Sequence, residues 1–171
     1  LRGALVPPGQ YGVRLIVGKD TLTRRFTVVA DPRVTSTSAE LTAQYAATRR
    51  VVDRITQIVD GVKRAEDLQS QLMDRAKRAT DSTVARMLGD SAKAVRTKIE
   101  AVRAELYEVG CHVDQCTLDM PTKLYNKFIT LNMQIQTGAY APTKQNGEVY
   151  DGLKSRLDVE LGELDRIERE E

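Results

Sequence analysis

The alternation of hydrophobic and polar residues predicts two β-strands near the start of the chain. From residue 11 onward the odd positions are hydrophobic and share one face of an extended strand. These positions are Tyr11, Val13, Leu15 and Val17. Residues 18–20 predict a short turn, and residues 21–29 predict a returning strand. The returning strand carries Leu22, Phe26 and Val28 on one side and Thr23, Arg25 and Thr27 on the other. An isolated hairpin is only marginally stable in water, so we expect something to cover it.

The hydrophobic period changes to about 3.6 residues after residue 35, which predicts helices. Thr37 and Glu40 have the spacing of a capping box, in which a hydroxyl and a carboxylate satisfy the first free amides of a helix. The predicted helices cover residues 38–78, residues 82–109, a segment from Pro121 to Gly138, and a segment that begins at Pro142. A bend is predicted at Asp60 and Gly61, and fraying or close packing at Gly147, Gly152 and Gly162.

Four amphipathic helices joined by short links predict an antiparallel bundle. The fold class predicted is therefore α+β and mainly α. A β-hairpin or partial immunoglobulin-like sandwich occupies residues 1–33, and a long antiparallel bundle of about four helices occupies residues 34–171.

Composition and charge narrow the class of protein. The 171 residues include 29% charged and 41% hydrophobic residues, which is typical of a folded protein, and the absence of Trp predicts an aliphatic core. The net charge of +2 is distributed unevenly: residues 1–37 hold six basic and two acidic residues, and residues 148–171 hold nine acidic and four basic residues. Because no concentrated basic surface with interleaved aromatics is present, we expect no nucleic-acid partner. No apolar run has the length of a transmembrane helix.

The segment CHVDQC at residues 111–116 holds both cysteines and the only histidine. It follows Gly110, which ends the second predicted helix, so the cysteines lie in a connection where their Cα atoms can approach within disulfide distance. The spacing matches neither a haem attachment nor a thioredoxin motif. We favour a disulfide between Cys111 and Cys116, with free buried thiols and metal or redox chemistry at Cys111–Cys116 as alternatives. His112 is then expected to be a solvent-facing loop residue.

Other motifs do not predict chemistry. Residues 12–19 (GVRLIVGK) lack the glycine spacing and the Ser or Thr of a phosphate-binding loop. Acidic pairs such as Glu66 and Asp67 lie on charged helix faces. Arg24 and Arg25 read as ordinary surface, or as a contact for an acidic partner. We therefore predict no catalytic, cofactor-binding or metal-binding residues and expect the chain not to be an enzyme.

Two stretches of the chain carry a resemblance to a known family. Residues 3–15 (GALVPPGQYGVRL), continued by residues 26–33 (FTVVADPR), look like the last strands of an immunoglobulin-like sandwich. Together with residues 121–153 (PTKLYNKFITLNMQIQTGAYAPTKQNGEVYDGL), they resemble the C-terminal region of bacterial sortilin-type, BNR-repeat β-propeller proteins, often labelled glycosyl-hydrolase-like. The resemblance implies an upstream propeller and export from the cytoplasm. It transfers no functional residue to this chain.

The sequence predicts a non-enzymatic structural or interaction module, the C-terminal fragment of a larger exported protein. We expect the incomplete sheet to dock on a protein partner through Tyr11, Val13, Leu15, Phe26 and Val28. A more specific expectation is a peripheral, periplasmic accessory subunit that stabilises a respiratory or photosynthetic membrane complex. The alternative is an auxiliary domain of a sialidase-like glycosyl hydrolase propeller.

Overall fold

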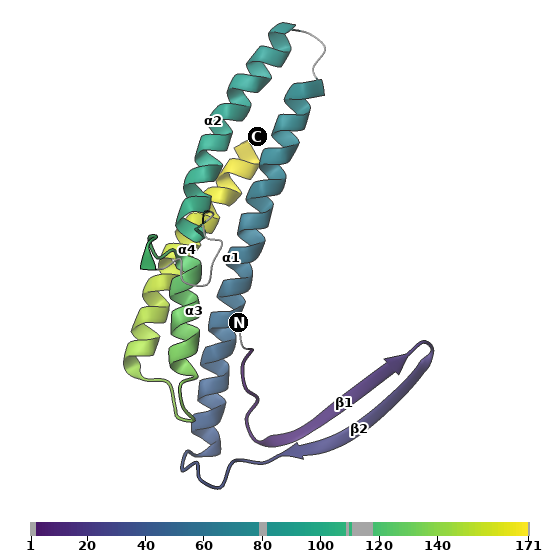
Figure 1. Cartoon of the computed structure of the whole chain (residues 1–171), viewed down its shortest axis with the longest axis vertical. Coiled ribbons are helices and arrows are strands. Elements are labelled where there is room, and N and C mark those ends of the chain that lie inside the picture. Colours follow the sequence, from purple (N-terminus) through teal and green to yellow (C-terminus); the bar gives the residue numbers. More distant parts are fainter. Residues whose placement is uncertain (1–2, 79–81, 109, 111–117, 171) are drawn as a thin grey trace.

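The chain consists of a β-hairpin followed by four helices. The computed structural model describes residues 3–78, 82–108, 110 and 118–170. Its elements, in order, are β1 (Gly9–Val17), β2 (Asp20–Val28), α1 (Ser38–Arg78), α2 (Ser82–Leu106), α3 (Leu124–Ile135) and α4 (Lys144–Glu170) (Figure 1). The predicted mainly helical α+β fold is therefore confirmed. The boundary predicted at residues 33 and 34 lies between β2 and α1, and independent folding of the two parts stays a prediction.

The two strands form an antiparallel hairpin closed by a two-residue turn. Val17 pairs with Asp20, so the turn consists of Gly18 and Lys19, one residue shorter than predicted. Gly18 has a φ of 60°, which glycine adopts at no steric cost and which suits the first central position of a type II′ turn. The described residues contain only this two-stranded sheet, so the part observed is the hairpin rather than a sandwich.

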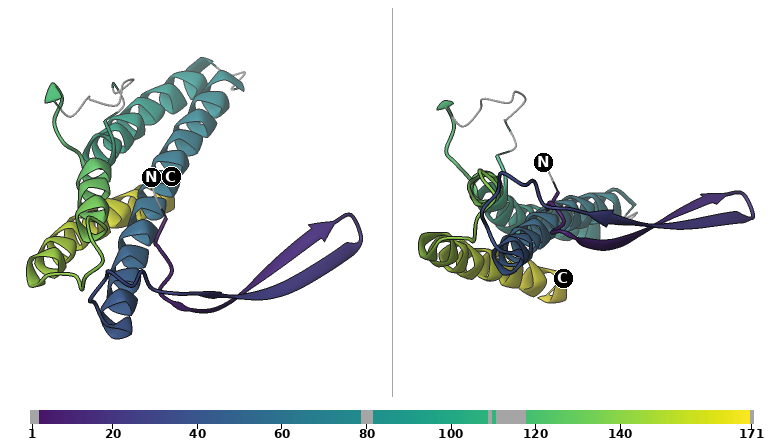
Figure 2. Two further views of the ribbon diagram at one scale, coloured as in Figure 1. Left: turned by 60° about the horizontal axis from the view of Figure 1, so that its bottom comes forward. Right: turned by 90° about the horizontal axis from the view of Figure 1, so that it is seen from below.

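The four helices form a bundle that is three helices wide. α2 and α3 lie end to end beside α1, and α4 is the third member. Glu66 on α1 pairs with Arg103 on α2, and Gly61 lies near Leu106, so these two helices run antiparallel. On the other side, α4 runs parallel to α1: Arg54 pairs with Asp158 and Arg64 pairs with Glu168. Figures 1 and 2 show α3 beside the first half of α1 and α2 beside its second half.

The first helix begins at the capping box that the sequence predicts. The amide of Thr37 donates to Glu40 Oε2 at 2.7 Å, and the amide of Glu40 donates to Thr37 Oγ1 at 3.2 Å. The hydrogen bonds that Glu40 Oε2 accepts from the amide and the hydroxyl of Thr37, chiefly the one from the amide, lower the pKa of Glu40 below its usual value. Thr143 and Asn146 make the same reciprocal arrangement at the start of α4.

The core is aliphatic apart from Phe128, as the composition predicts. All four helices contribute to one cluster of buried side chains. Its members are Ala47, Val51, Ile55, Ile58, Ala65, Val95, Ile99, Val102, Leu106, Leu124, Phe128, Leu131, Ile135, Leu153, Leu157, Leu164 and Ile167. On α1 the cluster ends at Ala65 and on α2 it begins at Val95, so the distal parts of these helices extend beyond it as a two-helix arm (Figure 1).

The glycines inside the helices act differently from the prediction. α1 is one continuous helix through Asp60 and Gly61, and Gly61 is buried against α4. A Cβ atom added at Gly61 would lie 2.8 Å from Leu161 Cδ2, so this glycine permits close approach of the two helices. At Gly147, Gly152 and Gly162 an added Cβ would meet open space, and α4 is continuous through all three.

Candidate functional site

The strand register places the five residues predicted to bind a partner on one face of the hairpin. Tyr11 pairs with Phe26, and Gly9 pairs with Val28. Because side chains alternate between the two faces along a strand, Val13 and Leu15 lie on the same side as Tyr11. We call this side the apolar face. Its hydrophobic members are Tyr11, Val13, Leu15, Val17, Leu22, Phe26 and Val28.

Most of the apolar face is open to solvent. The exposed fraction is 53% for Val13, 57% for Leu15 and 48% for Phe26. Tyr11 and Val28 lie nearer the helices and are half-buried. The rings of Tyr11 and Phe26 pack across the two strands with their centroids 6.0 Å apart. The predicted residues are therefore brought together, and the described part of the chain covers only the end of the face nearest the helices.

The apolar face also carries Arg24, for which the sequence left open either ordinary surface or contact with an acidic partner. Arg24 pairs with Val13 and so lies in the middle of this face, whereas Arg25 lies on the opposite one. The alternation that puts Leu22 and Phe26 on one side already places Arg24 between them. The opposite face is polar apart from Ile16. Its members are Gln10, Gly12, Arg14, Ile16, Thr21, Thr23, Arg25 and Thr27.

The hairpin projects from the helices, beside the place where the start of α1 meets the end of α3 (Figure 1). In Figures 1 and 2 both strands point away from the start of α1, and their tip is remote from every helix. The Tyr11 hydroxyl donates to the carbonyl oxygen of Pro7 at 2.6 Å. Gln44 on α1 donates to the carbonyl oxygen of Ile135 at 2.7 Å, and the hydroxyl of Ser36 donates to the carbonyl oxygen of Ala139. The bonds of Gln44 and Ser36 tie the start of α1 to the end of α3, and the bond of Tyr11 links β1 only to the segment that leads into it.

Hydrophobic residues that precede β1 and hydrophobic residues at the end of β2 line a small hollow beside α1. Its volume is about 240 Å³, and its lining is mostly apolar. Contributors include Leu5, Val6, Val28, Val29, Val34 and Leu41. Val28 is thus the strand residue that lines the hollow together with Leu41 of α1, and the remainder of both strands lies away from the helices (Figure 1).

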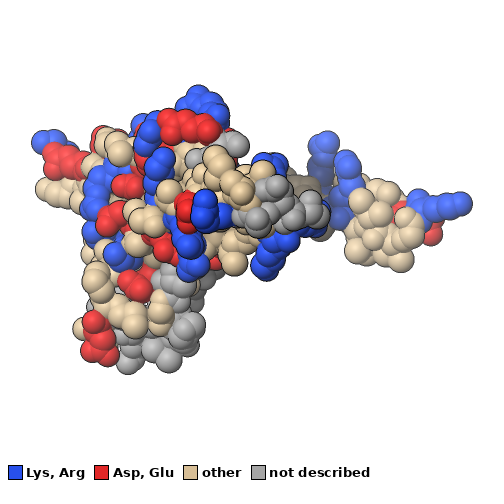
Figure 3. Space-filling model, turned by 90° about the horizontal axis from the view of Figure 1, so that it is seen from above, with Lys and Arg blue, Asp and Glu red and all other residues tan. Residues whose placement is uncertain are grey.

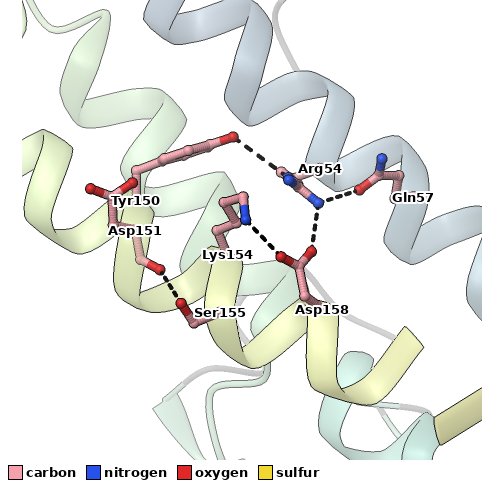
Figure 4. Close-up of polar contacts among 7 residues, drawn as sticks. All are labelled: Arg54, Gln57, Tyr150, Asp151, Lys154, Ser155 and Asp158. Atoms are coloured by element: carbon pink, nitrogen blue, oxygen red, sulfur yellow. Dashed lines mark hydrogen bonds and ion pairs between the residues drawn. The ribbon is translucent and has the colours of Figure 1, made fainter. Parts of the chain in front are cut away.

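A polar network joins α1 to α4 (Figure 4). Arg54 donates to Gln57 Oε1 at 2.9 Å and to Asp158 Oδ1 at 2.8 Å, and Lys154 donates to Asp158 Oδ2 at 2.7 Å. The hydrogen bond with Tyr150 raises the pKa of Arg54, and the hydrogen bond from Lys154 lowers the pKa of Asp158. Each charge has an opposite charge beside it, so this network fixes the packing of two helices.

The remaining sequence predictions concern metals, membranes and the cysteines. Within the described ranges, no three His, Cys, Asp or Glu residues gather in an arrangement that could hold a metal ion. No helix among the described residues combines the length and the hydropathy needed to cross a membrane. Cys111, His112 and Cys116 lie outside the described residues, so the disulfide stays a prediction.

Comparisons with known proteins found no relative. No protein-family model matches the chain, no curated protein is significantly similar in sequence, and no solved structure is significantly similar in fold.

Proposed function

We propose that the chain is a non-enzymatic interaction module that docks on a partner protein through the apolar face of its hairpin. The observation that carries this proposal is the contrast between the two faces. One face holds seven hydrophobic side chains, and the other is almost entirely polar. Antiparallel sheets with this pattern usually pack one face on a core and leave the other in water.

The physical reason is the instability of an uncovered hairpin. Two strands alone are marginal in water, and covering apolar surface contributes about 25 cal/mol per Å². Val13, Leu15 and Phe26 each leave roughly half of their surface exposed. A second sheet or a helical surface laid on the apolar face would remove this area from water. The backbone N–H and C=O groups along the two outer edges of the hairpin are free to pair with a strand of the partner.

The helices then serve as a rigid extension of the docked hairpin. The hydrogen bonds of Ser36 and Gln44 fix the start of α1, which directly follows the hairpin, on the end of α3. α1 alone has 41 residues, which corresponds to a length of about 60 Å at 1.5 Å per residue. A partner bound at the hairpin would therefore hold the distal α1–α2 arm at a fixed distance, as a spacer or second contact surface.

We further propose that the partner is an exported assembly, and that the chain is a periplasmic, peripheral accessory subunit of a respiratory or photosynthetic membrane complex. The resemblance of residues 3–33 and 121–153 to the C-terminal region of sortilin-type propeller proteins supports export. A disulfide between Cys111 and Cys116 would agree with it. Native mass spectrometry of solubilised membranes tests this location, because the subunit would appear in the mass of the complex.

Paired substitutions on neighbouring residues of β1 test the docking proposal. Leu15 lies on the apolar face and Ile16 on the opposite one, with exposed fractions of 57% and 64%. Leu15→Ser should weaken association with the native partner, measured by co-purification and native mass, while Ile16→Ser should leave it unchanged. Both variants should retain the helical circular dichroism signal. Equal association of the two variants with the partner would contradict the proposal.

A further inference from the structure

The register of the hairpin determines which backbone groups are free for pairing with another strand. In a two-residue hairpin the residues that flank the turn bond each other, here Val17 and Asp20. Bonded and non-bonded pairs then alternate along the ladder. The backbone N–H and C=O groups that point outward from β2 therefore belong to Thr21, Thr23, Arg25 and Thr27, and those from β1 belong to Gln10, Gly12, Arg14 and Ile16.

The outer edge of β2 is the better template for an added strand. Three of its four outward positions are threonine, a β-branched residue that favours strands, and none is glycine or proline. The edge of β1 contains Gly12, which weakens a strand, and follows Pro7 and Pro8. In Figure 1 β1 borders the angle between the hairpin and α1, whereas β2 lies on the outer side. An incoming strand therefore reaches β2 without meeting the helices.

The positive charge of the hairpin favours an incoming strand that carries negative charge. Residues 9–28 carry four basic residues and one acidic residue, and none of the basic ones takes part in an ion pair within the described structure. On the helical body, by contrast, Arg54 and Arg64 are paired with carboxylates across α1 and α4. Figure 3 shows blue Lys and Arg side chains spread along the projecting hairpin with little red beside them.

The side chain of Arg24 already binds a backbone group on the outer edge of β2. The guanidinium of Arg24 donates to the carbonyl oxygen of Thr23 at 3.0 Å. This carbonyl is one of the outward acceptors of β2, so Arg24 covers a group that an added strand would use. A carboxylate on an incoming strand offers Arg24 a stronger, charge-assisted bond and frees the carbonyl of Thr23.

We propose, on the basis of the docking function above, that the outer edge of β2 accepts an acidic β-strand of the partner protein, and that Arg24 and Arg25 select its charge. A second copy of this chain fits poorly. Arg24 is the middle residue of β2, so a two-fold pairing of β2 with its copy would set Arg24 against Arg24, and like charges directly opposite are destabilising. An anionic membrane could attract the same cations but would leave the outward amides of β2 unpaired, so the vesicle experiment below distinguishes it from an acidic strand.

Two peptides as long as β2 test the proposal on the full chain. Both alternate valine and threonine, with two adjacent Glu residues in the middle of one and two adjacent Lys residues in the other. The Glu peptide should bind at least about tenfold more tightly, as expected when charge pairs differ by about 1.4 kcal/mol. It should protect the amides of Thr21, Thr23, Arg25 and Thr27 from hydrogen exchange. The double variant Arg24→Glu/Arg25→Glu should prefer the Lys peptide.

Proline variants identify the edge. Thr23→Pro removes one outward N–H from β2 and should abolish binding of the Glu peptide, whereas Gly12→Pro removes one from β1 and should leave binding unchanged. Both prolines replace outward amides, so cross-strand contacts seen by nuclear magnetic resonance should persist in each variant.

Three results would overturn the inference. They are equal affinity for the two peptides, protection of the β1 amides instead of the β2 amides, and sedimentation with vesicles of 30% phosphatidylserine without binding of the Glu peptide. If Leu15→Ser still prevents partner association in that case, the docking proposal stands and only the edge is wrong.

Discussion

Gly61 of α1 faces Leu161 of α4 so closely that any side chain at Gly61 would have to displace the terminal methyl groups of Leu161. A Cβ atom at Gly61 would be 2.8 Å from Leu161 Cδ2 and 3.6 Å from Leu106 Cδ1. This one residue therefore lies where α1, α2 and α4 meet. Gly152, on α4, has nothing within 4 Å of an added Cβ.

The two glycines should respond in opposite ways to substitution. Gly152→Ala should raise the free energy of unfolding by roughly 1 kcal/mol, because alanine favours the helix and meets no neighbour. Gly61→Leu should lower it by about 1–3 kcal/mol through overpacking at the junction of three helices. Urea unfolding followed by circular dichroism measures both. A stabilised Gly61→Leu variant would show that α4 does not pack on α1 as described.

Phe128 should be the most sensitive position of α3. It is fully buried, and its ring meets Tyr150 of α4 edge-on, with centroids 6.4 Å apart. Phe128→Ala should reduce the free energy of unfolding by about 3–5 kcal/mol because it leaves a large cavity. Met133 on the same helix is 59% exposed, and Met133→Ala is the matched control, with a change within about 0.5 kcal/mol. Comparable losses of unfolding free energy in the two variants would mean that α3 does not pack on the core through Phe128.

Acidification should weaken the contact between α1 and α4. Lys154 and Arg54 lower the pKa of Asp158 in the folded chain below its usual value of 3.8. A carboxylate with a lowered folded pKa stabilises the fold above its unfolded pKa, and this stabilisation is lost as the pH falls through the folded pKa. The loss therefore lies below about pH 4, and solvent exposure of the pair keeps it under about 1 kcal/mol.

The variant Asp158→Asn isolates this effect. Unfolding free energies of the wild type and the variant should differ at pH 6 and converge as the pH approaches 2. Asp151→Asn serves as the control, because Asp151 lies two turns earlier on α4 and its carboxylate takes no part in the network of Figure 4. A difference for Asp158→Asn that does not change with pH would mean that the carboxylate does not act through its charge.

Local patterns predict the elements of this fold well because they are properties of neighbouring residues. The helix predicted at residues 38–78 is α1 to the residue, since both its capping box and its hydrophobic stripe are local signals. The second helix ends at Leu106, three residues earlier than predicted. The alternation in residues 11–17 likewise placed Tyr11 and Leu15 on a common face.

The arrangement of these elements depends on contacts between distant residues and was predicted only in outline. Sequence favours a bend at Gly61, but its role depends on Leu161, a hundred residues later. The tandem placement of α2 and α3 along α1 has no local signal, because each helix carries a similar apolar stripe. The position of Arg24 on the apolar face, by contrast, follows from simple alternation with Phe26 and could have been predicted.

The most direct test that the apolar face is an interaction surface is photo-crosslinking from two adjacent positions. A photoreactive amino acid replaces Leu15 in one protein and Ile16 in another, and each is produced in the native cells and irradiated. The two side chains are similarly exposed and point to opposite faces of β1. Position 15 should yield an adduct of one defined mass, and position 16 should yield little. Adducts of equal yield from both positions, or none from position 15, would contradict the account.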